Sequence, residues 1–104
     1  MKVLVVEPGK KPCAQEIDSG LRSMQEVVGG YIQAVYPFED DVAIVCNEEG
    51  KLMGLPPNRP LYDEDGRVYD ILVGTFFVCA CPPEAESFQS LTEEQIEKYA
   101  KIFR

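Results

Sequence analysis

The stretch from Val42 to Arg59 reads VAIVCNEEGKLMGLPPNR and joins an apolar run to a turn and a double proline. Val42 to Cys46 has the β-branched character of a buried strand. Glu48-Glu49-Gly50 fits a three-residue hairpin loop with Gly50 left-handed, so Lys51 to Met53 are predicted to pair back onto that strand. Leu55-Pro56-Pro57 is predicted to be an extended surface segment, because proline lacks the backbone donor that a central strand needs.

Upstream of this stretch, the sequence predicts two strands around one helix. Val3 to Val6 is apolar throughout and fits a central strand covered on both faces. Asp18 or Ser19 is expected to cap a helix, whose buried face carries Leu21, Met24 and Val28. Gly29-Gly30 ends that helix, since glycine readily adopts the left-handed conformation of a C-cap. Tyr31 to Tyr36 then fits a strand that stops at Pro37.

Downstream, a turn, two extended segments and a second helix are expected. Asp63 to Gly66 forms the turn, and Gly74 marks a bulge or bend between Val68–Ile71 and Thr75–Ala80. Residues 82–90 are expected to be a linker. Within residues 91–104, Thr92 and Gln95 form a capping box, Leu91 and Ile96 form a hydrophobic staple, and an apolar stripe follows that consists of Ile96, Tyr99, Ala100 and Phe103.

These elements predict an α+β fold with a mostly antiparallel sheet of about five strands and two helices. The 104 residues are expected to form a single domain. Residues 1–81 supply the sheet and the first helix in this interpretation, and the C-terminal helix packs on the sheet.

Composition narrows the classes of function. The chain is 45% hydrophobic and 27% charged, and it has no apolar run near the roughly 20 residues of a membrane helix. No export signal is recognisable, so the cytoplasm is the expected location and the four cysteines are expected to be reduced. The net charge of −8 argues against direct nucleic-acid binding. Without histidine, and with one C-x-C pair, the sequence predicts neither a metal site nor a cofactor.

No catalytic residue is predicted. The absence of histidine removes the usual general base, and no G-x-S-x-G sequence is present. Gly29-Gly30 lies at a helix C-terminus on this reading, where free carbonyls repel an anion.

Two polar positions beside the prolines are the strongest candidates for binding. Asn58 and Arg59 are ordered in advance by Pro56 and Pro57, which lowers the entropy cost of recognising a carboxylate, a phosphate or a base edge. The structural alternative is that Asn58 bonds the local backbone and Arg59 pairs with Asp70 or with the turn at Asp63. Asp70 lies in an apolar run and needs a partner, which Arg59 or Lys51 would supply.

Several stretches resemble one family when they are taken in order. They are LRSMQEVVGGYIQAV (21–35), NEEGKLMGLPPNR (47–59) and DILVGTFFV (70–78). This combination resembles the domain-of-unknown-function family numbered 3846, small proteins of phages, plasmids and other bacterial mobile elements. The family resembled offers no catalytic residues. The positions of this chain that match its motifs are Gly29, Gly30, Tyr31, Asn47, Glu48, Glu49, Gly50, Lys51, Leu55, Asn58, Asp70 and Gly74. Pro60 and the Cys79–Pro82 segment depart from the pattern, which puts the end of the sheet and the path of LPPNR in question.

Three hypotheses follow for function. The first is a non-catalytic accessory protein that engages a host protein or small ligand; its expected binding residues are Asn47, Glu48, Glu49, Lys51, Asn58, Arg59 and Asp70. The second is a DNA-mimicking inhibitor, because the sequence from Glu39 to Asp70 contains nine carboxylates and only three basic side chains. The carboxylates expected to imitate DNA phosphates are Glu39 to Asp41, Glu48, Glu49 and Asp63 to Asp65. The third is a magnesium-dependent enzyme that uses Asp70 with Glu48 or Glu49.

Overall fold

Five strands form one antiparallel sheet in the computed structural model, which describes residues 1–104. In spatial order they are β2 (Cys13–Glu16), β1 (Lys2–Val6), β7 (Phe76–Ala80), β4 (Val42–Asn47) and β3 (Ile32–Val35). The register places Ile44 of β4 between Val35 of β3 and Val78 of β7. The predicted α+β class with a mostly antiparallel sheet is confirmed.

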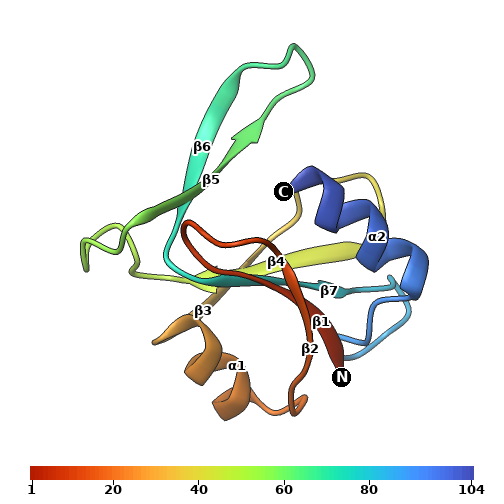
Figure 1. The fold of residues 1–104 in the computed structure, drawn as a ribbon. Helices are drawn as coiled ribbons and strands as arrows, with labels where there is room; N and C mark the ends of the chain where they lie inside the picture. The colour runs from red at the N-terminus through yellow and green to blue at the C-terminus, as the bar shows by residue number, and fades with distance from the viewer.

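Two further strands form a hairpin that projects from the body of the molecule (Figure 1). They are β5 (Pro57–Tyr62) and β6 (Val68–Val73), joined by the predicted turn with Gly66 at φ 78°. The predicted pairing of Lys51 to Met53 with β4 is wrong, because β3 and β7 already occupy both edges of β4. The double proline instead leads into the hairpin.

The sheet is covered on both faces, as Figure 1 shows. Helix α1 (Leu21–Val28) buries Met24 and Val28 on one face, against a cluster that includes Val3, Val5, Val45 and Phe77. Helix α2 (Glu93–Ile102) and the hairpin cover the other face, where the buried side chains include Leu61, Leu72, Tyr99 and Phe103. Strand β1 is buried from Val3 to Val6 and is paired on both sides, as a strand covered on both faces requires.

The caps predicted for the two helices agree with the structure in all but one case. Gly20, and neither Asp18 nor Ser19, is the N-cap of α1, and it makes no side-chain cap hydrogen bond. Gly29 ends α1 at φ 80° and donates its N–H to the Gln25 carbonyl, as predicted. Thr92 and Gln95 form the predicted capping box of α2. Before α2, Gln89 bridges to Ala80, so residues 82–90 end against the sheet.

Candidate functional site

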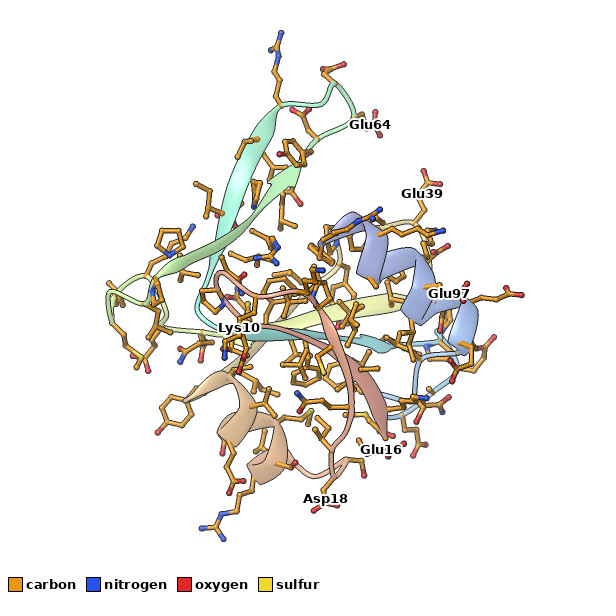
Figure 2. The ribbon with its side chains drawn as sticks, in the orientation of Figure 1. Lys10, Glu16, Asp18, Glu39, Glu64 and Glu97 are labelled. Carbon is orange, nitrogen blue, oxygen red and sulfur yellow. The ribbon has the colours of Figure 1, made fainter.

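Arg59 points into the molecule and joins three segments that are distant in sequence. Its Nε donates to the Phe103 carbonyl at 2.7 Å, and its Nη2 donates to the Lys10 carbonyl at 2.6 Å. Its Nη1 donates to the carbonyl and to the side-chain oxygen of Asn58. The expected pairing of Arg59 with Asp70 or with the turn at Asp63 is therefore wrong. The guanidinium fastens the base of the hairpin to α2 and to the β1–β2 loop, where Figure 2 labels Lys10.

Asn58 ties the same hairpin to the main sheet. Its side-chain nitrogen donates to the carbonyls of Val6, at 2.9 Å, and of Gly74, at 2.8 Å. Both amide hydrogens are thus used on backbone carbonyls, and the side-chain oxygen is used on Arg59. Asn58 therefore makes long-range bonds instead of the local backbone bond expected from the sequence.

Asn47 is also turned inward, at the end of β4. It is the one buried polar side chain, 5% exposed, and its nitrogen donates to the Val28 carbonyl at the end of α1. Its side-chain oxygen accepts the Glu49 N–H, an arrangement that holds the following turn. A Cβ at Gly30 would lie 2.9 Å from the Asn47 nitrogen, so a side chain there would displace the Asn47 amide. Tyr31 has an exposed ring, and its carbonyl accepts the Glu48 N–H.

Leu55 is the packing centre for two of the glycines. Its Cδ1 lies 2.7 Å from the site of a Cβ on Gly74 and 3.4 Å from one on Gly50. Gly74 has φ 71° and donates its N–H to the Pro56 carbonyl, so it forms the predicted bend between β6 and β7. Gly50 is not left-handed as predicted; Gly54 takes that conformation instead. Residues 50–54 form successive turns, closed by the Met53 N–H on Glu49 and the Leu55 N–H on Gly50.

Lys51 and Asp70 form the ion pair of this region. The Lys51 ammonium donates to Asp70 Oδ1 at 2.5 Å, and the same oxygen accepts the Ile71 N–H. The hydrogen bond from Lys51 lowers the pKa of Asp70 below its usual value. Lys51, not Arg59, is thus the partner of Asp70.

A pocket of about 270 Å³ opens beside this ion pair, between β3, the 48–54 loop and β6. Four of the predicted binding residues line it, namely Asn47, Glu48, Lys51 and Asp70. Glu49, Asn58 and Arg59 do not line it. The structure thus brings together four of the seven predicted binding residues and assigns Asn58 and Arg59 to holding the hairpin in place.

The apolar side of this pocket was not predicted from the sequence. Leu52 is 88% exposed at its rim, and Ile71 is 45% exposed on β6 opposite. Gln33 and Val35 of β3 complete the wall. Leu52 lay in the segment predicted as a paired strand, which concealed its exposure. The sequence feature that could have indicated this exposure is a leucine that directly follows the polar residues 47–51.

Two of the titratable side chains that line the pocket, Cys46 and Asp70, have shifted pKa values. Burial raises the pKa of the Cys46 thiol, which therefore stays protonated and weakly nucleophilic at neutral pH. Asp70 is paired, and its lowered pKa makes it a poor proton acceptor. No group of three His, Cys, Asp or Glu residues is arranged to hold a metal ion.

A second cleft, of about 240 Å³, lies between the hairpin and the end of α2. Phe38, Tyr62, Ile102 and Phe103 are among the residues that line it, together with Arg59 and Arg104. The donors of Arg59 are directed at Phe103, Lys10 and Asn58, as described above. This cleft contains no residue of the 47–51 motif.

The carboxylates proposed to imitate DNA belong to separate loops. Glu39 follows β3 and Glu64 lies at the tip of the hairpin, as labelled in Figure 2. Asp40 accepts hydrogen bonds from Lys98 and Tyr99, and Asp63 accepts the N–H groups of Asp65 and Arg67. These two carboxylates are thus engaged within the protein instead of standing in a free row.

Comparison with known proteins identifies the family. The sequence profile of DUF3846, described as a domain of unknown function, matches residues 1–104. The chain belongs to this family. No curated protein and no solved structure gives a significant match. Neither helix has the length and apolar composition needed to cross a lipid bilayer.

Proposed function

We propose that the protein is a non-catalytic binding protein that engages a host protein or a small ligand at the pocket between β3, the 48–54 loop and β6. The observation that carries this proposal is the convergence of Glu48, Lys51 and Asp70 with exposed Leu52 and Ile71 around one pocket. A few polar groups beside apolar side chains are typical of a binding site. The four free cysteines are compatible with action in the cytoplasm.

We also propose an accessory role in a mobile genetic element of bacteria, as the family resemblance of the sequence implies. In this proposal the hairpin base presents the pocket, and Lys51 and Asp70 orient a polar group of the partner. A carboxylate-based enzyme is the less favoured alternative. Glu48 and Asp70 share the pocket, but Asp70 is bound to Lys51.

Native mass spectrometry of the protein purified from its own host tests the proposal. The double variant Leu52→Ser/Ile71→Ser removes the apolar rim without emptying the core, because both side chains are exposed. Leu21→Ser/Ile102→Ser is a matched control, with exposures of 56% and 49% on the two helices. We expect the wild type and the control to retain a partner mass that the rim variant loses. A partner retained by the rim variant, or a wild type that carries none, would contradict the proposal.

A further inference from the structure

Strand β3 leaves one edge of the five-stranded sheet open. Its only paired neighbour is β4. The Glu48 N–H bonds the Tyr31 carbonyl, so the alternating antiparallel pattern directs Tyr31, Gln33 and Val35 toward β4. Ile32 and Ala34 therefore direct their N–H and C=O groups away from the sheet, and no hydrogen bond within the protein uses them.

The two edge strands of the sheet, β2 and β3, differ in the features that prevent another strand from pairing with them. Edge strands in soluble proteins usually carry charge, proline or a bulge, which prevents another strand from pairing. On β2, Glu16 supplies charge within the strand. A proline lies just outside each edge segment, Pro12 before β2 and Pro37 after Tyr36. The segment Tyr31–Tyr36 (YIQAVY) has neither charge nor proline, and its register with β4 is regular. Its two tyrosines are 64% and 61% exposed at the ends of the strand.

The open edge runs beside the pocket. Gln33 and Val35, which point to the same face of β3, are both part of the pocket wall. A strand that paired with β3 would project every second side chain onto this face. One of those side chains would enter the pocket and contact Leu52 and Ile71, which line it.

The carboxylates at the two ends of β3 favour a partner strand that carries basic residues at its own ends. Glu48 donates its N–H to the Tyr31 carbonyl and Glu49 follows it in the chain, while Glu39 and Asp41 follow Tyr36 in the β3–β4 loop. An uncharged edge is thus bracketed by carboxylates. A second copy of this chain would place like charges together in antiparallel pairing, whereas a peptide with basic ends would neutralise them.

We propose that the partner of this pocket is an extended peptide segment that adds to β3 as a sixth strand, with an uncharged centre, a side chain in the pocket, and lysine or arginine at its ends. This inference rests on the binding function proposed above. Backbone hydrogen bonds to Ile32 and Ala34 supply affinity, and the pocket and the flanking carboxylates supply specificity.

The test selects binders from a library of random twelve-residue peptides displayed against the folded protein. Selected peptides should combine an alternating uncharged centre with basic ends. In the labelled protein they should slow hydrogen exchange at the amides of Ile32 and Ala34. Ala34→Pro removes an outward N–H from β3, and Ala14→Pro removes the equivalent outward N–H from β2. We expect Ala34→Pro to weaken peptide binding about tenfold or more, the loss of roughly 1.4 kcal/mol, and Ala14→Pro to leave it unchanged.

A second variant keeps the proposal testable if Ala34→Pro does not fold. Gln33→Lys places a charge in the pocket wall, where the uncharged centre of the added strand would lie, and should also weaken peptide binding. No enrichment, unaltered binding to both variants, or peptide-free dimers that protect Ile32 and Ala34 would overturn strand addition. Peptides that shift only the Leu52 and Ile71 amides would overturn it too, while leaving the proposed pocket function intact.

Discussion

Arg59 and Asn58 act at the scale of single residues as the fasteners of the hairpin. Arg59 reaches carbonyls 44 and 49 positions away, and Asn58 reaches one 52 positions away. A local sequence pattern contains no information about such distant acceptors. The rigidity supplied by Pro56 and Pro57 was therefore predicted, whereas the inward direction of both side chains was not.

Replacing Arg59 with alanine should destabilise the protein. The variant loses three hydrogen bonds to backbone carbonyls and one to the side-chain oxygen of Asn58, so we expect the free energy of unfolding to fall by about 2 kcal/mol. Arg67→Ala is the control, since Arg67 is exposed and its side chain makes no hydrogen bond; its change should stay within about 0.5 kcal/mol. Equal stability of the two variants in urea unfolding would show that Arg59 does not hold the hairpin.

Replacing Gly74 with alanine separates backbone strain from packing. Gly74 and Gly66 have φ of 71° and 78°, so alanine at either position costs about 1 kcal/mol or more. A Cβ at Gly74 also meets Leu55 at 2.7 Å, whereas one at Gly66 meets nothing within 4 Å. Thermal unfolding should therefore show a larger loss for Gly74→Ala. Similar losses would mean that Leu55 moves away without cost.

At the scale of elements, α2 is held by its capping box at the N-terminal end and by Asp40, which contacts Lys98 and Tyr99. Tyr99 is fully buried and donates its hydroxyl to Asp40 Oδ2 at 2.6 Å, and Lys98 pairs with the same oxygen. The capping box and the apolar stripe could be read from local spacing. The contact with Asp40 could not, because it joins a loop and a helix 59 positions apart.

The Asp40 contacts make stability depend on pH. The hydrogen bonds from Lys98 and then Tyr99 lower the pKa of Asp40 below its ordinary value of 3.8. A lowered folded-state pKa stabilises the protein above the unfolded pKa, and the contribution disappears as the pH falls through the folded value. Wild type should therefore be more stable than Asp40→Asn at pH 6, and the difference should shrink below about pH 4. Asp41→Asn, whose side chain makes no hydrogen bond, is the control; a difference that persists at pH 2 would contradict this assignment.

The 48–54 loop shows why one predicted element failed. Glu48-Glu49-Gly50 satisfies the local rules of a hairpin, but Leu55 packs beneath Gly50 and Gly74 and draws the chain into successive turns. The strand pairing also depended on β4 having a free edge, which β3 and β7 occupy. Tertiary contacts thus decided the conformation, and they exposed Leu52 at the pocket.

At the scale of the whole molecule, the motif residues divide into two groups. Gly50, Leu55, Asn58 and Gly74 build the junction between hairpin and sheet, and Asn47 joins the end of β4 to α1. Glu48, Lys51 and Asp70 lie at the pocket beside that junction, next to the open edge of β3. The same short motif therefore supports the fold and places the surface that we propose for binding.

The most direct test of this division maps a partner recovered from the host onto the amide spectrum of the labelled protein. The account predicts that perturbed amides gather in three segments, residues 32–35, 48–52 and 70–73. Perturbations that instead gather at the cleft formed by Phe38, Tyr62 and Ile102 beside Arg59 would contradict it.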